Sequence, residues 1–214
     1  MTASLLVNAT SVLSDISALP SPVMALLRQC GAMQRPHSGR TLFDHLVGTH
    51  NLLRAWGNSS SICLGGLFHS IYGTNAFRHE SLSEQDRPRL RDLIGDEAER
   101  LAWDFCHVDR PAAIIAAIHQ ALDRSAANPA SILRSTVEPN WSSLAEIEVA
   151  NLLEQGSQSR ALRQLFFLGM EKLDVLSSGA QSALKNTLSA QLRMNAKPPV
   201  QLPAIVSNLG GRDE

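Results

Sequence analysis

Histidines are concentrated in one stretch of this 214-residue chain, because four of the seven lie between residues 37 and 69. Imidazole binds transition metals and also changes its protonation state near neutral pH, so it serves both metal chemistry and acid–base chemistry. His45 and His69 are the two that we single out, because each is expected on a helix. We therefore expect the functional site within residues 37–74.

The helix that carries His45 has a clear start and a clear end. Thr41 and Asp44 form a capping box, in which each side chain pairs with a backbone NH of the first turn. Gly57 offers the left-handed conformation that ends a helix. Between them, apolar residues recur with a period near 3.6, at Leu42, Phe43, Leu46, Val47, Leu52 and Leu53.

A second helix is predicted from Ser59 or Ser60 to about Tyr72. The connection between the two helices is short, which favours antiparallel packing. His45 near the start of the first helix can then face His69 near the end of the second. The sequence predicts two imidazoles in one layer.

Gly65 and Gly66 share a helical face with His69, and each costs about 1 kcal/mol against alanine inside a helix. Two explanations remain open from the sequence. The glycines can allow close packing of helices, or they can leave room for a ligand or metal beside His69.

Several polar residues are expected to surround the histidines. Cationic side chains precede the first helix on a loop with proline and glycine, which suits an anionic ligand. Asn151 falls on the apolar stripe of a later helix, so its amide needs a partner in the core. The residues expected to contact substrate are Arg35, His37, Arg40, Tyr72 and Thr74.

The remainder of the chain also reads as helices. Capping signatures occur at Ser81–Glu84 and Ser143–Glu146, and further helices are predicted over residues 22–30, 96–106, 112–123, 157–174 and 178–193. The segment 112–123 is apolar almost all round, which predicts a central helix with His119 as a core residue. We expect an all-α fold, a single compact bundle of eight or nine helices over residues 1–196, and a loosely ordered tail over 197–214.

Composition excludes several classes of partner. The net charge of −1 gives no general attraction to nucleic acid or anionic lipid, and no apolar run is long enough to span a membrane. Three widely spaced cysteines and no secretion signal favour a reducing cytoplasm. A small anionic metabolite is the expected partner, and a homo-oligomer stays open.

With these residues in order, the chain resembles the HD-domain superfamily of helical metal-dependent phosphohydrolases over residues 30–156. The local pattern is most similar to the hydrolase domain of the Rel-type alarmone enzymes, and it also resembles an offshoot of the superfamily with no established activity. His45 matches the first histidine of the motif, and His69 matches the histidine of its His-Asp pair. Ser70 and Asn151 stand where the family has metal-binding aspartates.

The resemblance implies a hydrolase-like enzyme acting on a phosphate or other ester, with His45, His69 and Asn151 in catalysis. Its altered metal site would hold one divalent Zn, Fe or Mn ion on His45 and His69. An iron-dependent oxygenase is a further option on the same scaffold. Without metal, the same residues would serve as a binding pocket or as an acid–base site. Additional metal ligands would come from His50, His79, His119 or Glu148.

Overall fold

The computed structural model describes residues 19–37, 39–74, 79–123, 139–156 and 175–195. The all-α prediction is confirmed: within these ranges the chain forms eight α-helices, one 3-10 turn and one two-stranded hairpin. The helices are α2 (Ser21–Gln29), α3 (Leu42–Ala55), α4 (Ser60–Leu67), α5 (Arg87–Ile94), α6 (Asp96–His107), α7 (Ala112–Asp123), α9 (Trp141–Gln155) and α11 (Ser178–Asn195). The 3-10 turn spans Glu84–Asp86, and the hairpin pairs β1 (Pro36–His37) with β2 (Arg40–Thr41).

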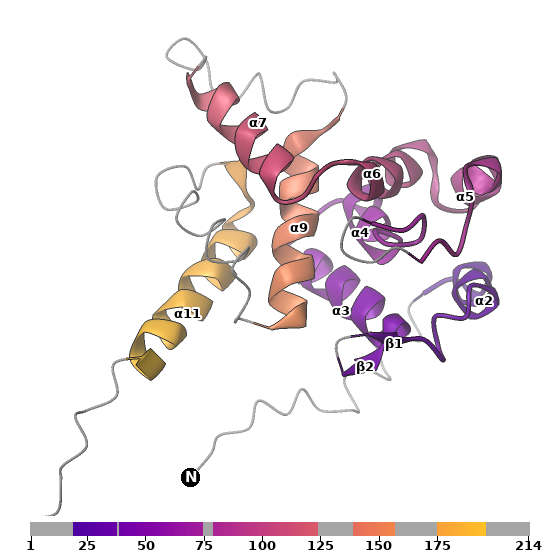
Figure 1. Ribbon diagram of the computed structural model, residues 1–214, viewed down its shortest axis with the longest axis horizontal. Coiled ribbons are helices and arrows are strands. Elements are labelled where there is room, and N and C mark those ends of the chain that lie inside the picture. The colour runs from indigo at the N-terminus through magenta and orange to yellow at the C-terminus, as the bar shows by residue number, and fades with distance from the viewer. Residues whose placement is uncertain (1–18, 38, 75–78, 124–138, 157–174, 196–214) are drawn as a thin grey trace, which may run out of the picture.

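Helix α9 is the centre of the molecule. It contacts α3, α4, α6, α7 and α11, and every residue from Ser143 to Leu152 is buried. Figure 1 shows α9 standing between α11 on one side and the group of α3, α4 and α6 on the other. Within that group, α4 packs against both α3 and α6.

The prediction that residues 112–123 form the central helix is wrong. Helix α7 buries Ile114 and Ile118, which lie one turn apart, while His119 is exposed. The alanines of α7 made the segment look apolar on all sides. A run of small apolar residues is also compatible with a helix that packs on one face only. The expectation of a core His119 therefore fails too.

The start of α3 follows the prediction. The Thr41 hydroxyl accepts the NH of Asp44 at 3.1 Å, and the Asp44 carboxylate accepts the NH of Thr41 at 3.1 Å. Gly57 has a φ of 79° just after the helix. The capping box thus fixes where His45 lies, in the first turn of α3.

Helix α4 is shorter than predicted, because it ends at Leu67 instead of Tyr72. Its last turn contains Gly65 and Gly66, which hold a helix poorly, and the Gly66 carbonyl accepts the ring Nδ1–H of His69 at 2.6 Å. That carbonyl would accept the NH of Ser70 if the helix continued. His69 consequently lies in the turn that follows α4.

Two capping predictions shift by a few residues. The capping box expected at Ser81–Glu84 is formed by Ser83 and Asp86 instead. Helix α9 is capped by Asn140, whose side-chain oxygen accepts the NH of Ser143 at 3.2 Å. Local sequence allows several neighbouring polar residues to cap, and tertiary packing selects one of them.

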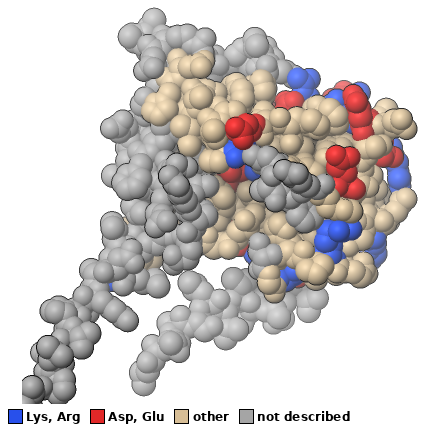
Figure 2. Space-filling view, viewed as in Figure 1, with Lys and Arg blue, Asp and Glu red and all other residues tan. Residues whose placement is uncertain are grey.

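Other predictions fall outside the described residues, namely the helix 157–174 and the tail 197–214. Among the helices that the structure describes, none is long and apolar enough to cross a bilayer. Acidic and basic side chains are interspersed on the face shown in Figure 2.

Candidate functional site

His45 and His69 meet in the interior, where only 1% and 2% of their surfaces are exposed. Their Nε2 atoms lie 3.2 Å apart, and the two rings stand nearly perpendicular at an interplanar angle of 81°. The predicted proximity of the two imidazoles is confirmed. They come from the first turn of α3 and from the turn after α4.

The protonation of His69 is set by its surroundings. Its Nδ1–H donates to the Gly66 carbonyl, so a neutral ring carries its lone pair on Nε2. Burial lowers the pKa of His69 well below its ordinary value, and the nearby His45 lowers it further. His69 therefore presents a bare Nε2 to His45.

His45 is held from its other side by Glu154 of α9. The Glu154 carboxylate, with 5% of its side chain exposed, contacts Nδ1 of His45. This carboxylate accepts a hydrogen bond from the Nδ1–H of His45, and Nε2 of His45 faces the lone pair of His69. Two lone pairs facing each other at 3.2 Å would repel, so a shared proton or a bound cation between the two Nε2 atoms would satisfy both rings.

Two residues secure Glu154 in this position. Gly48 of α3 makes room for the Glu154 side chain, because a Cβ at position 48 would lie 2.9 Å from Cδ of Glu154. Arg40 of β2 pairs with the Glu154 carboxylate and also donates from Nη2 to the Glu154 carbonyl at 2.7 Å. The Arg40 side chain is 39% exposed, so this ion pair connects the site to the surface.

His37 extends the cluster toward the surface. Its ring stacks on His45 with 4.4 Å between centroids and an interplanar angle of 26°. Burial lowers the pKa of His37, and so does the proximity of His45 and Arg40, against the opposing effect of Glu154. The hairpin thus brings His37 and Arg40 to the histidine pair, and their contact with a substrate stays a prediction.

A second ion pair lies close to His69. Arg110 and Glu148 are joined at 2.7 Å with 5% and 3% of their side chains exposed. The Arg110 guanidinium lies 3.7 Å above the Phe105 ring, and Phe105 meets the His69 ring edge to face at 5.1 Å. Arg110 also contributes to the lowered pKa of His69.

The Asn151 side chain is hydrogen-bonded to two other side chains of α9. Its Nδ2 donates to Glu148 at 3.2 Å, and its Oδ1 accepts from Gln155 at 2.7 Å. Both ends of the amide thus have helical neighbours as partners. Asn151 satisfies the expected need for polar partners in the core through its own helix.

The other residues expected at the site have different surroundings. The Tyr72 hydroxyl donates to Glu99 at 3.1 Å, and burial together with Glu99 raises the pKa of Tyr72. Thr74 is buried. The Ser70 hydroxyl and the Arg35 Nε atom are buried and have no hydrogen-bond partner among the described residues.

No third metal donor joins the histidine pair within the described part of the chain. These residues contain no cluster of three His, Cys, Asp or Glu side chains that could hold a metal. His50 is part-buried, with its Nδ1 3.1 Å from Oδ1 of Asn51. His119 is exposed, His79 is part-buried in the segment before α5, and Glu148 is engaged by Arg110.

Sequence reasoning missed Glu154, Gly48 and Arg110. A signal for Glu154 was present, because it lies three residues after Asn151 and so shares its helical face. Gly48 and Arg110 gave no local signal, since their roles depend on contacts with α9. These contacts join segments far apart in the sequence.

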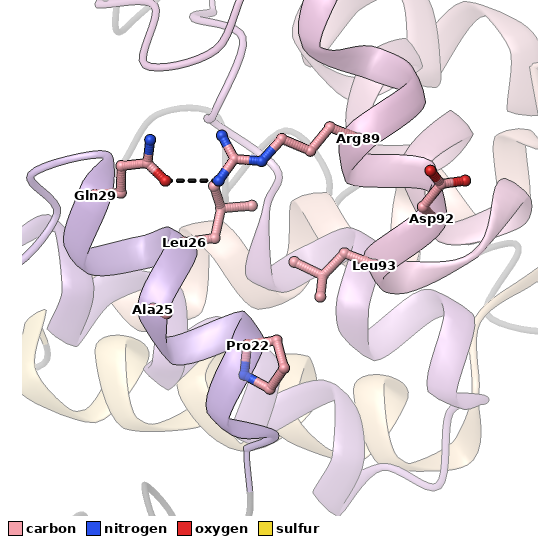
Figure 3. Close-up of a pocket in the computed structure, with 7 residues that line it drawn as sticks. All are labelled: Pro22, Ala25, Leu26, Gln29, Arg89, Asp92 and Leu93. Carbon is pink, nitrogen blue, oxygen red and sulfur yellow. Dashed lines mark hydrogen bonds between the residues drawn. The ribbon is translucent and has the colours of Figure 1, made fainter.

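A separate groove of about 400 Å³ lies between α2 and α5 (Figure 3). At one end, Arg89 donates from Nη2 to the Gln29 side chain at 2.6 Å. None of the histidines lines it. The full lining is Pro22, Ala25, Leu26, Gln29, Arg89, Asp92 and Leu93.

A family model described as a domain of unknown function (DUF6817) matches residues 26–110. No curated protein and no solved structure matches the chain. The matched residues include His45, His69 and Arg110, whereas helix α9 with Glu148 and Glu154 lies beyond them.

Proposed function

We propose that the chain is an HD-domain-like enzyme that binds one divalent transition metal through His45 and His69 and hydrolyses an ester of a small anionic metabolite. The observation that carries this proposal is the arrangement of the imidazoles. Their Nε2 atoms converge at 3.2 Å, while each Nδ1 is held by a hydrogen-bond acceptor.

The nitrogen separation suits a metal site. With Zn–N bonds of 2.0–2.1 Å, two nitrogens of a tetrahedral site lie roughly 3.3–3.4 Å apart. Histidines that bind metals commonly donate their second ring NH to a carboxylate or a carbonyl. Glu154 and Gly66 are such acceptors here.

The donor set indicates which metals fit. Imidazole nitrogens suit Zn²⁺ and Fe²⁺, whereas Mg²⁺ prefers oxygen ligands. Two protein ligands leave coordination positions for water and substrate. A bound divalent metal would make that water more acidic and would polarise the ester oxygen.

Charges around the histidines suit an anionic substrate. Arg40 and Arg110 are each paired with a glutamate, so a divalent metal on the histidines would add positive charge beside these two ion pairs. Arg40 is the part-exposed member of these pairs and the one placed to meet a ligand entering from solvent.

The test is metal content together with activity on the full chain. We expect near one equivalent of Zn or Fe after purification without chelator, and its loss in His45→Ala and His69→Ala. Exposed His119 provides the control, since His119→Ala should retain the metal. Hydrolysis of a panel of phosphomonoesters and phosphodiesters should follow metal content across the four proteins.

A metal-free site for a small anion is the second candidate, favoured by the contact between Glu154 and His45. A proton between the two Nε2 atoms satisfies both rings, and the resulting imidazolium pairs with Glu154. If wild-type protein stays empty after incubation with Zn²⁺ or Fe²⁺, the metal proposal fails. Thermal-shift screening with small phosphate and carboxylate compounds then tests this candidate.

A further inference from the structure

Helix α9 holds a buried glutamate one turn beyond Asn151, and we infer that this residue, Glu154, is the positioning residue that turns Nε2 of His45 toward His69. The inference rests on the same site as the proposed function, but its first readout needs no metal. Glu154 would act through Nδ1 of His45 and not as a ligand.

The contacts of Glu154 support this role. Its carboxylate touches Nδ1 of His45 from outside the pair, so it fixes both the ring orientation and the nitrogen that holds the proton. A carboxylate hydrogen-bonded in this way also makes the opposite nitrogen a better donor of electron pairs. The orientation of His45 therefore depends on a residue of another helix, 109 positions further along the chain.

The space and charge around Glu154 are matched to this contact. A Cβ on Gly48 would come within 2.9 Å of both Cγ and Cδ of Glu154, so any larger residue would displace the carboxylate. Arg40 holds the carboxylate and also the Glu154 backbone carbonyl at the end of α9. Three elements, β2, α3 and α9, thus meet at this one side chain.

The test uses two variants that disturb the contact by different means. Glu154→Gln removes the charge while keeping the size, and Gly48→Ala keeps the charge while moving the carboxylate. The matched control is Glu146→Gln, which alters another buried α9 glutamate, one that pairs with Asn58 and Ser177. Circular dichroism establishes whether each variant is folded. If Glu154→Gln does not fold, the result for Gly48→Ala alone decides whether the inference holds.

The first readout is the NMR signal of the His45 Nδ1 proton in ¹⁵N-histidine-labelled, metal-free protein. We expect a downfield, slowly exchanging proton in wild type and in Glu146→Gln, and its shift or loss in Glu154→Gln and Gly48→Ala. Unchanged His45 signals in both site variants would overturn the inference. A purely structural role of Glu154 would not move this signal selectively.

The second readout is Co²⁺ affinity measured by visible absorption. We expect about 10- to 100-fold weaker binding in Glu154→Gln and Gly48→Ala, which is the usual effect of losing such a partner, and no comparable loss in Glu146→Gln. Equal weakening in all three variants would contradict a specific role. If wild type binds no Co²⁺, the metal proposal fails and the His45 signal alone decides the inference.

Discussion

At the scale of single residues, the site combines the two histidines with two positions where the resemblance would place carboxylates. Ser70 keeps a buried hydroxyl without a partner in the described part of the chain, whereas Asn151 is bonded to Glu148 and Gln155. These two positions are thus different in kind. One could accept a new polar contact, and the other already has two.

We predict that Asn151→Asp lowers the free energy of unfolding by about 1–3 kcal/mol at pH 7. The substitution removes the amide donor to Glu148 and places a second carboxylate beside it. The loss should shrink as the pH falls toward 4, since protonation of one carboxyl group removes the repulsion. Urea unfolding at several pH values measures this, with wild type as reference, and a pH-independent loss would contradict the explanation.

Cys106 gives a prediction of reactivity. Burial raises the pKa of its thiol to about 12, and the thiol donates to the His69 carbonyl at 3.2 Å. The thiolate is the reactive form, so Cys106 should stay protonated and unmodified in folded protein at pH 8.

Thiol titration with a disulfide reagent checks this expectation. Folded wild type and Cys106→Ala should react with the same number of equivalents, and the wild type should gain one equivalent over the variant in urea. An extra reactive thiol in the folded wild type would contradict the assigned burial.

At the scale of elements, α4 is shaped by its two glycines. A Cβ on Gly65 would lie 2.9 Å from the Leu101 Cβ of α6, and a Cβ on Gly66 would collide with the Leu53 side chain of α3. The structure thus favours close packing, on two sides at once, over room for a ligand. The sequence showed that the glycines needed an explanation, but the partners that supply it come from other helices.

We predict that Gly65→Ala is more destabilising than Gly66→Ala. A Cβ at Gly65 would meet the Cβ of Leu101 and the backbone oxygen of Ala98, and neither atom can rotate away. At Gly66 the nearest atom is the end of the Leu53 side chain, which can move. Overpacking at Gly65 should cost about 1–3 kcal/mol, offset in part by the better helix propensity of alanine. Chemical denaturation of the two variants measures the order, and the reverse order would contradict this packing.

At the scale of the whole molecule, the site depends on contacts across long stretches of sequence. Helical periodicity and the Thr41 capping box predicted α3 well, and the short loop predicted the meeting of His45 and His69. Neither kind of signal could identify α9 as the centre, because burial on all sides depends on which helices surround it. For the same reason, the pairing of Glu154 with Arg40 and His45 escaped prediction.

We predict that a fragment of residues 19–123 does not unfold cooperatively, although it contains all of the matched residues 26–110. Without α9 it would expose Leu53 and Phe105, which share a buried cluster with Leu144 and Ile147 of α9. Thermal unfolding followed by circular dichroism, compared with the full chain, tests this. A sharp transition in the fragment would show that α9 is not required for the fold.

The 3.2 Å contact between the two Nε2 atoms has a consequence for how the proposed metal binding would depend on acidity. A gap of that size holds either one hydrogen or one metal ion, so the two compete for the same position. Every cation that enters a metal-free, hydrogen-bridged pair must expel a proton, and acidic solution must favour the empty form. Calorimetric titrations of metal into the protein, in buffers of different ionisation enthalpy at one pH, would measure that proton release. The observed heat of binding should change with the buffer, whereas the affinity should stay the same.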